Sequence, residues 1–340
     1  MPSTRKTADV AGSDTVLDIQ GLTVRFETAD GEVQAVSDLS LTVAKGECLG
    51  IVGESGSGKS QTFMAALGLL ADNGRATGKV MFGDADLLTA NEATLNSIRG
   101  NRAAMVFQDH MTSLTPHMKV GRQLTEVLQR HRGLDAKAAL DAVIAMLRRV
   151  QIPEPERRAE MYPHELSGGL RQRVMIAMGL LCHPELLIAD EPTTALDVTV
   201  QALILDLIRD VKDSDNTAVI LITHDLGVVA GLADRVAVMY AGRVVELGDV
   251  NQIFSEPQHP YTQGLLACSP RLDDALGGKL KTIPGQPPNL QRLPPGCAFA
   301  PRCPYVIAAC AERPPLRPAA GGGLKACVRD DLASITKAAS

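Results

Sequence analysis

Two periods of hydrophobic positions alternate between residues 16 and 255. Short, almost continuously apolar runs of the kind found in buried strands occupy residues 47–53, 103–108, 186–190 and 218–223. Each run ends at polar or glycine-rich residues. Between them, residues 201–214 (QALILDLIRDVKDS) have the apolar spacing of a helix. Strands that alternate with helices predict an α/β fold with a parallel sheet and helical crossovers.

Two other patterns interrupt this alternation. Residues 16–43 alternate with period two on either side of Asp30 and Gly31, which predicts an antiparallel hairpin. Residues 112–166 have helical spacing throughout and lie between two of the predicted core strands. We therefore expect an antiparallel β subdomain at the start of the chain and a helical subdomain inserted into the parallel core.

The composition of the chain changes near Glu256. Of the 20 prolines, 13 lie between Pro257 and Pro318, so regular elements should be short there. From Glu256 onward Lys and Arg exceed Asp and Glu by 10 to 6, although the whole chain carries a net charge of −5. We expect a flexible N-terminus over 1–15, a main domain over 16–255 and a loop-rich C-terminal extension over 256–340.

The sequence also bears on the compartment. Residues 1–13 are small and polar and lack the apolar core of a signal peptide. No apolar run approaches the roughly 18 residues of a membrane-spanning helix. The acidic net charge argues against a nucleic-acid partner. These features predict a cytosolic protein, in which cysteines stay reduced and a cysteine cluster points to metal or catalysis before disulfides.

Residues 53–60 read GESGSGKS, which fits the phosphate-loop pattern G-x-x-x-x-G-K-[ST] between a predicted strand and a predicted helix. Glycines let backbone N–H groups turn toward phosphate oxygens, and the following helix presents its positive end to the same anion. Lys59 would reach the β- and γ-phosphates and Ser60 would bind Mg²⁺. A glycine-rich turn that binds nothing is the disfavoured alternative. The predicted ATP-binding residues here are Gly53, Glu54, Ser55, Gly56, Ser57, Gly58, Lys59, Ser60 and Gln61.

The strand over 186–190 ends in two acidic residues. Asp190 would lie at the polar end of the strand, where it can hold Mg²⁺. Glu191 follows and would face the γ-phosphate, where it can orient or deprotonate water. Alone, such a pair before Pro192 would be interpreted as a solvated acidic surface. Together with the phosphate loop, it predicts a nucleotide-hydrolysing site.

Residues 166–173 (LSGGLRQR) resemble the signature of ATP-binding-cassette (ABC) ATPases, and other matching elements stand in the order of that family. The resemblance implies that Phe26 stacks on adenine, that Gln108 joins Ser60 and Asp190 at Mg²⁺, and that His224 contacts the γ-phosphate beside the catalytic Glu191. Ala195, Leu196 and Asp197 resemble the dimer-contact loop. The resemblance thus implies an ABC-type P-loop nucleotide-binding domain.

In this family the signature contacts the γ-phosphate held by the opposite subunit, so the resemblance implies a protein that works as half of a pair. Ser167 would begin a helix and offer its hydroxyl and backbone donors to that anion. Leu170 stands where many family members have glutamine. Because Ser167, Gly168 and Gly169 are intact, we expect the contact to survive.

Longer segments, among them FQDHMTSLTP (107–116), HPYTQGLL (259–266) and IPGQPPNLQRLPPGCAFAPRCP (283–304), resemble ATPase subunits of bacterial dipeptide and oligopeptide importers, most of all the D-type subunit of oligopeptide importers. His110 and Thr115 depart from that group's usual proline and asparagine. The resemblance implies three kinds of partner: a second, paralogous ATPase, two membrane permeases and an extracytoplasmic peptide-binding protein. It also implies that this chain is a peripheral protein at the cytoplasmic face of the inner membrane.

Other functions stay open. Related importers carry nickel, glutathione or antimicrobial peptides, and the cargo is chosen by other subunits. A soluble ABC ATPase that acts on nucleic acid, ribosomes or cluster assembly is disfavoured, because this chain has a single cassette and no sustained heptads. A regulatory half that does not hydrolyse ATP would lack Glu191 or His224, and both are present.

Four cysteines of the extension are spaced C-x5-C-x6-C-x16-C, at Cys297, Cys303, Cys310 and Cys327. Four thiolates suit zinc or a [4Fe–4S] cluster, although zinc knuckles use shorter gaps. The importer resemblance implies an iron–sulfur cluster at these positions; zinc and free thiols remain alternatives. We expect such a centre to fold the extension and to lie apart from the ATP site. The other three cysteines are predicted to be small core residues: Cys48, Cys182 and Cys268.

Overall fold

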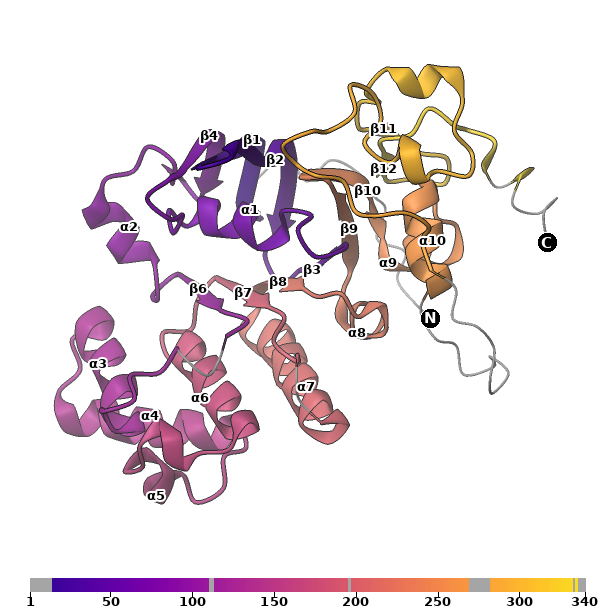
Figure 1. The fold of residues 1–340 in the computed structure, drawn as a ribbon. Coiled ribbons are helices and arrows are strands. Elements are labelled where there is room, and N and C mark those ends of the chain that lie inside the picture. The colour runs from indigo at the N-terminus through magenta and orange to yellow at the C-terminus, as the bar shows by residue number, and fades with distance from the viewer. Residues whose placement is uncertain (1–13, 110–112, 195–196, 269–281, 333, 336–340) are drawn as a thin grey trace. The chain divides into compact units, whose positions relative to one another are not determined.

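The computed structural model describes residues 14–109, 113–194, 197–268, 282–332, 334 and 335. They form two compact units (Figure 1). The first unit takes its described residues from 1–42, 49–88 and 223–340, and the second from 43–48 and 89–222. Each unit is therefore assembled from segments that are far apart in the sequence.

An antiparallel sheet opens the first unit. Its strands are β1 (Thr15–Thr28), β2 (Gly31–Ala44), β4 (Gly74–Phe82) and β5 (Ala85–Asp86), in the order β2-β1-β4-β5. Only two residues separate β1 from β2, and the strands are neighbours, which confirms the predicted hairpin. The alternating pattern buries Leu17 opposite Phe82 across the β1–β4 pair, so one face of the sheet is apolar.

A second group of strands in the first unit runs in the order β11-β12-β10-β9-β3. Only β3 and β9 are parallel; β9 with β10, β10 with β12 and β12 with β11 are antiparallel. The strands are β3 (Cys48–Val52), β9 (Arg235–Tyr240), β10 (Arg243–Asp249), β11 (Arg317–Pro318) and β12 (Leu324–Lys325). The accompanying α-helices are α1 (Lys59–Ala66), α8 (Leu226–Leu232), α9 (Val250–Ser255) and α10 (Pro260–Cys268).

The extension after residue 256 is part of the first unit. It contributes α10, β11, β12 and two short 3-10 helices, η2 (Ala300–Arg302) and η3 (Ala308–Ala311). Strand β12 pairs with β10, so that Lys325 lies opposite Glu246. An aromatic contact joins the extension to β9 as well, since the ring centroids of Phe299 and Tyr240 are 5.3 Å apart. The extension thus continues the sheet and core of this unit, and the boundary expected at 256 stays a prediction.

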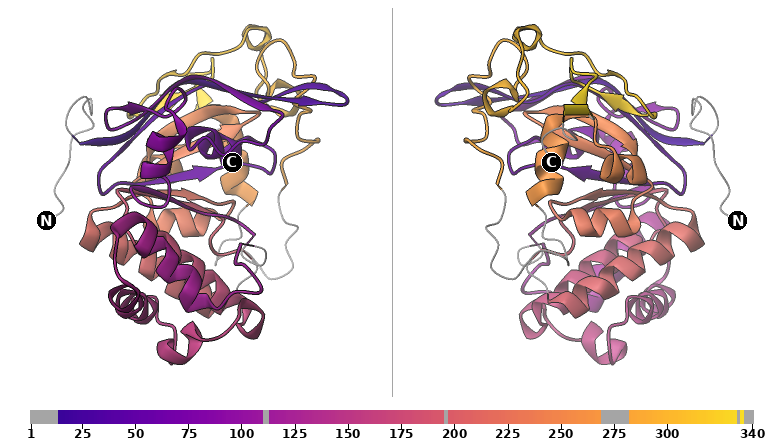
Figure 2. Two further views of the ribbon diagram at one scale, coloured as in Figure 1. Left: turned by 90° about the vertical axis from the view of Figure 1, so that its left-hand side faces the viewer. Right: turned by 90° about the vertical axis from the view of Figure 1, so that its right-hand side faces the viewer.

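Parallel strands form the centre of the second unit. β6 (Ala103–Val106), β7 (Leu186–Asp190) and β8 (Ala218–Ile222) pair in parallel, in the order β8-β7-β6, and β7 and β8 are buried throughout. This confirms a parallel core built from three of the four apolar runs. The helices, drawn in magenta and salmon in Figure 2, are α2 (Glu92–Ile98), α3 (Val120–Arg132), α4 (Ala136–Arg149), α5 (Pro155–Ala159), η1 (Pro163–Glu165), α6 (Gly168–Leu180) and α7 (Val198–Asp215).

The helices between β6 and β7 form the inserted subdomain that the sequence predicts. Helix α3 buries Leu124 and Leu128, and α4 buries Val143 and Leu147 at the spacing of one helix face. Asp135 begins α4 by accepting a hydrogen bond from the backbone of Ala138 at 2.8 Å. Throughout the described residues, no helix has both the length and the apolar character needed to cross a membrane.

Candidate active site

The phosphate loop connects β3 to α1 in the first unit. Gly58 has a left-handed backbone with φ 94°, and a Cβ there would lie 2.3 Å from the carbonyl oxygen of Ala35. A Cβ at Gly53 would lie 2.2 Å from the carbonyl oxygen of Met239. Any larger residue would displace the backbone at either position, because real Cβ atoms do not approach so closely. These glycines are therefore needed for the shape of the loop.

The donors of the loop are buried. Lys59 is 7% exposed, and its Nζ donates hydrogen bonds to the carbonyl oxygens of Gly53 at 2.7 Å and Glu54 at 3.0 Å. The hydroxyl of Ser57 is also buried and has no hydrogen-bond partner among the described residues. A buried polar group normally has a partner, so this hydroxyl suits an oxygen-rich ligand such as a phosphate. The loop thus fits the phosphates of a nucleotide.

Two further predicted residues lie in the first unit. The backbone N–H of Thr223 donates to Ile51 of β3 at 3.1 Å, which ties the segment of His224 to the strand that leads into the loop. His224 is exposed, and Asp225 after it caps α8. Phe26 is half-buried on β1 opposite Gly74, whose missing side chain leaves room for the ring. Its role at adenine stays a prediction.

The second unit contains the acidic pair. Asp190 ends β7 and is 5% exposed. Glu191 has a left-handed backbone with φ 48°, which costs a residue with a Cβ roughly 1–2 kcal/mol. Its Oε2 accepts hydrogen bonds from Nε2 of Gln108 at 2.8 Å and from the hydroxyl of Thr194 at 2.9 Å. The structure therefore brings together Gln108 and Glu191, which were both expected at the nucleotide, and adds Thr194.

The signature forms the start of α6. Ser167 is the N-cap, and its Oγ accepts from the backbone of Leu170 at 3.4 Å, so leucine at this position leaves the cap in place. A Cβ at Gly169 would lie 3.1 Å from Cγ1 of Val200 on α7. Gln172 is fully buried and donates to the carbonyl oxygen of Pro192, which fixes α6 to the segment that follows Glu191.

Sequence reasoning missed both Thr194 and Gln172. Their signals were a hydroxyl three residues after Glu191 and an amide one helical turn after Gly168, and neither spacing is specific without the fold.

Of the predicted dimer loop, Ala195 and Leu196 lie outside the described residues, and Asp197 caps α7 at 3.0 Å from the backbone N of Val200. Of the two departures, His110 lies outside them too, whereas the backbone N–H of Thr115 donates to Gln123 at 2.9 Å.

The residues expected to contact nucleotide or the dimer partner are divided between the units. The first unit holds Phe26, the phosphate loop with Ser60 and Gln61, and His224; the second holds Gln108, Asp190, Glu191, Ser167 and its glycines, and Asp197. The assignment of Ser60, Gln108 and Asp190 to one Mg²⁺ accordingly stays a prediction. All three offer the oxygen ligands that Mg²⁺ prefers.

The four cysteines of the extension line one pocket in the first unit, together with His259 and Phe299. The backbone N–H of Cys297 donates to the carbonyl oxygen of Cys310 at 2.9 Å. Burial raises the pKa of Cys303 to about 11 and raises the pKa values of Cys297 and Cys327, so these three thiols are neutral at pH 7. Across the part of the chain that the structure describes, no three Cys, His, Asp or Glu side chains are placed to hold a metal ion.

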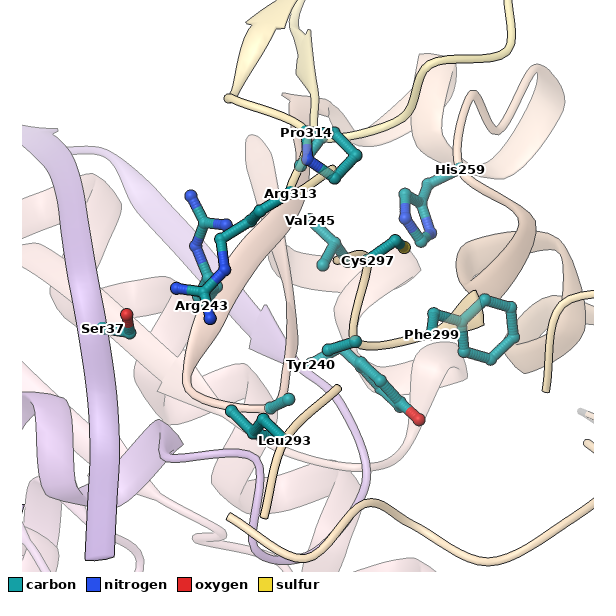
Figure 3. Close-up of a pocket in the computed structure, with 13 residues that line it drawn as sticks. Ser37, Tyr240, Arg243, Val245, His259, Leu293, Cys297, Phe299, Arg313 and Pro314 are labelled. Atoms are coloured by element: carbon teal, nitrogen blue, oxygen red, sulfur yellow. The ribbon is translucent and has the colours of Figure 1, made fainter. Parts of the chain in front are cut away.

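An adjoining pocket shows how the extension meets the sheet (Figure 3). Cys297, His259 and Phe299 gather on one side, with Arg243 and Arg313 close together opposite them.

Of the remaining cysteines, Cys48 and Cys182 are buried as predicted, but Cys268 at the end of α10 is partly exposed and is not a core residue. The buried residues of α10 lie in its first turn, Pro260–Thr262, so the later part of the helix that carries Cys268 is not in the core.

The extension contacts the phosphate loop directly, while the expectation that its metal centre lies apart from the ATP site stays a prediction. Arg302 of η2 forms an ion pair with Glu54, with 2.7 Å between Nη1 and Oε2. The hydroxyl of Tyr261 on α10 accepts a hydrogen bond from the backbone N–H of Glu54 at 2.8 Å. Both contacts join residues that are more than 200 positions apart, which is why local sequence patterns do not predict them.

A phosphate loop borne by a strand, together with a serine-capped glycine signature on a separate helix, defines the class of ABC ATPases. The family model described as ABC transporter matches residues 36–194, and the model described as oligopeptide/dipeptide transporter, C-terminal region, matches residues 245–310. Among solved structures, a dimeric post-hydrolysis state of the ATP-binding cassette MJ0796 bound to ADP and Pi superposes with a TM-score of 0.63 at 26% identity, over 69% of this chain and 98% of that one.

Relatives of nearly the same length narrow the class. The oligopeptide transport ATP-binding protein OppD of Salmonella typhimurium is 55% identical over 317 residues, which cover 93% of this chain and 94% of that protein. The protein of the same name from Escherichia coli is 54% identical with the same coverage. The chain therefore belongs to the family of oligopeptide transport ATP-binding proteins within the ABC class.

Proposed function

We propose that this chain is the ATP-hydrolysing subunit of an importer that powers the uptake of oligopeptides or dipeptides across the bacterial inner membrane. The observation that carries this proposal is the similarity to OppD over 93% of the chain, which includes the C-terminal region as well as the cassette. The cassette alone would support only an ABC ATPase. The match to the C-terminal region of oligopeptide/dipeptide transporters supports an ABC ATPase of the peptide-transport type.

The residues of the site suit hydrolysis by water. Glu191, oriented by Gln108 and Thr194, can accept a proton from a water molecule as its oxygen attacks the γ-phosphorus. The bond to the leaving ADP oxygen breaks, and the products are ADP and phosphate. Lys59, the hydroxyl of Ser57 and the backbone N–H groups of the loop stabilise the charge on the transferred group. Mg²⁺ bound with ATP would neutralise part of the charge on the phosphate oxygens.

The family resemblance implies that the signature acts on the nucleotide of a partner, and the chemistry of its helix suits an anion. Ser167 is exposed at the N-terminus of a 13-residue helix, where unsatisfied N–H groups favour an anion. We propose that this end binds the γ-phosphate held by a second, paralogous ATPase, and that the pair docks on two membrane permeases served by a peptide-binding protein. The chain would then be a peripheral protein at the cytoplasmic face of the membrane.

Copurification with its partners tests this proposal. The tagged chain should bring down a second ATPase and two permeases from detergent-solubilised membranes. Deleting its gene should abolish peptide uptake, and a plasmid copy should restore it. A chain that copurifies only with itself, or a deletion strain that takes up di- and oligopeptides normally, would contradict the proposal. Uptake of nickel in the same strains separates the peptide importer from a related metal importer.

We also propose that Cys297, Cys303, Cys310 and Cys327 bind a [4Fe–4S] cluster that orders the extension. Support comes from the four thiols lining one pocket, from thiolate being the ligand that iron–sulfur clusters require, and from the family resemblance. Their side chains are not arranged as a preformed metal site, so binding would draw the sulfurs together. Thiols with raised pKa values would also have to lose their protons on binding.

Anaerobic purification with iron and sulfide analysis tests the cluster. We expect about four irons and four sulfides per chain, as the cluster type requires, and a loss of both in Cys303→Ser. Cys182→Ser, which alters a buried cysteine of the second unit, is the matched control and should keep the iron. Stoichiometric zinc without sulfide, or neither metal, would refute the cluster.

A further inference from the structure

Glu54, the second residue of the phosphate loop, is held at both ends by the C-terminal extension. Its carboxylate accepts two hydrogen bonds from the guanidinium of Arg302, at 2.7 Å to Oε2 and 2.9 Å to Oε1. Its backbone N–H donates to the hydroxyl of Tyr261 at 2.8 Å. A bidentate pair of this kind fixes direction as well as distance. The first turn of the loop is thus clamped by residues 207 and 248 positions later in the sequence.

The position of Arg302 is itself fixed by its surroundings. The residue is 9% exposed, and its guanidinium carbon lies 5.9 Å from the ring centroid of Tyr240 and 6.0 Å from that of Phe299. Its Nε donates to the carbonyl oxygen of Pro284 at 2.9 Å. A guanidinium buried against aromatic rings needs a compensating anion, and the Glu54 carboxylate supplies one. The ion pair is therefore a built contact between well-packed groups.

Glu54 passes this constraint on to the groups that face the phosphates. Its carbonyl oxygen accepts from Nζ of Lys59 at 3.0 Å and from the backbone N–H of Ser57 at 3.2 Å. A shift of Glu54 would change the direction of both donors. Phosphate binding depends on such donors being oriented before the ligand arrives.

We propose that Arg302 is a positioning residue for the phosphate loop, and that the extension thereby sets the affinity of the chain for ATP. The proposal rests on the proposed ATPase function and deepens it. It assigns to the C-terminal region a direct effect on nucleotide binding in addition to any role in holding a cluster or contacting partners. Arg302 does not touch the nucleotide in this scheme; it acts through Glu54.

The test is a double-mutant cycle on the full-length chain, with a fluorescent ATP analogue and Mg²⁺ as the probe, well below the melting temperature. Arg302→Gln and Glu54→Ala should each raise the Kd by about 5- to 50-fold, which lies within the change in affinity that typical coupling free energies between two sites produce. The Kd of the double variant should be no higher than that of the single variant that binds more weakly, because the pair acts as one unit. The Kd of Arg302→Lys should lie between those of the wild type and Arg302→Gln, since an ammonium keeps the charge but cannot form two parallel hydrogen bonds.

A matched control and the alternatives make the outcomes distinct. Arg292→Gln changes an exposed arginine of the same extension and should leave the Kd unchanged. If the wild type binds ATP and both single variants bind equally well, the inference is overturned while the proposed function stands. Losses that add in the double variant also overturn it. If Arg302→Gln does not fold, Glu54→Ala, which breaks the pair from its more exposed side, decides alone. A wild type that does not bind ATP overturns both the proposed function and the inference.

Discussion

At the scale of single residues, the backbone and two hydrogen bonds fix the carboxylate of Glu191, the proposed general base. The left-handed backbone aims the side chain away from the direction it would take in a continued strand, and two neutral donors then orient the carboxylate. Strained backbone of this kind persists only where neighbouring contacts hold it. Here they include the backbone hydrogen bond from Glu191 to Ile222 at 2.8 Å and the contact of Gln172 with Pro192.

Glu191→Gln should therefore keep ATP binding and lower hydrolysis. The amide preserves the size of the side chain but cannot accept a proton, and loss of a general base costs about 10²–10⁴-fold in rate. Steady-state ATPase assays of the assembled transporter, with nucleotide binding measured in parallel, provide the check. Glu27→Gln, which alters an exposed carboxylate on β1, is the control and should turn over normally. Near-normal turnover in Glu191→Gln would exclude this residue as the base.

At the scale of elements, the loop between β3 and α1 depends on close approach of backbone to backbone. Gly53 abuts the end of β9 and Gly58 abuts β2, so the shape of the loop depends on strands that precede and follow it in the sequence. Gly56, by contrast, would meet no atom within 4 Å if it carried a Cβ. The glycines of one motif thus have different physical roles.

This difference predicts unequal effects of alanine. Gly53→Ala should abolish ATP binding, because its Cβ would lie 2.2 Å from the carbonyl oxygen of Met239 and the loop would have to move. Gly56→Ala should cost only about 1 kcal/mol of stability for its left-handed backbone and should weaken binding much less. Equilibrium binding of an ATP analogue to the two variants, with melting temperatures as a control for folding, decides the matter. Equal losses would contradict this account.

The pairing of β10 with β12 places an ionisable group in an apolar setting. Burial raises the pKa of Glu246 from 4.5 to about 7, although the nearby Lys325 partly opposes the shift. The carboxylate also accepts hydrogen bonds from the backbone N–H groups of Gln258 and His259, at 2.6 Å and 2.9 Å. Protonation of Glu246 is thus linked to the contact between the extension and the sheet.

Glu246 should accordingly make the first unit less stable as the pH rises from about 4.5 to about 7. Burial lowers the pKa of the adjoining His259 from 6.5 to about 3, so that residue acts in the opposite direction up to about pH 6.5. In that interval the Glu246 carboxyl is protonated to a greater extent in the folded than in the unfolded chain, so its contribution to the free energy of unfolding decreases with pH, by up to about 3 kcal/mol. Urea unfolding of the wild type and Glu246→Gln at pH 5 and pH 8 measures the effect. Relative to the wild type, Glu246→Gln should gain stability from pH 5 to pH 8, because only the contribution of His259 remains, whereas Glu256→Gln, at an exposed site, should follow the wild type. An unchanged slope in Glu246→Gln would refute this assignment.

At the scale of the whole molecule, the chain contains a phosphate loop and a signature, the two parts that the proposed pair of ATPases would share between subunits. The phosphate loop lies in one unit and the signature helix in the other. In the family, each nucleotide is bound between the loop of one subunit and the signature of the next. The extension also contacts this site, because Arg302 of the cysteine-bearing segment forms an ion pair with Glu54 of the phosphate loop.

ATP hydrolysis by the isolated chain should therefore be slow and should rise more than linearly with protein concentration, as pairs form by mass action. Adding the paralogous ATPase and the permeases should increase the rate per chain. Ser167→Ala in this chain should lower hydrolysis in the assembled complex, and Ser113→Ala, at an exposed serine of the same unit, serves as control. A purified monomer with full activity that does not depend on concentration would contradict the shared site.

The amino-acid sequence by itself determined the features that depend on neighbours along the chain. The β1–β2 hairpin, the parallel core strands, the phosphate loop and the serine cap of α6 were all predicted, because hydrophobic period, turn residues and caps act over a few residues. Gln108 and Glu191 were both assigned to the nucleotide site, Gln108 only through the resemblance to a family, but the hydrogen bond between them was not predicted. Tertiary structure alone decided the contacts of Thr194 and Gln172, the addition of β12 to β10, and the clamp of Arg302 and Tyr261 on Glu54. These contacts depend on which side chains the completed fold brings together, and loop-rich segments such as the extension carry no periodic pattern that would reveal their partners.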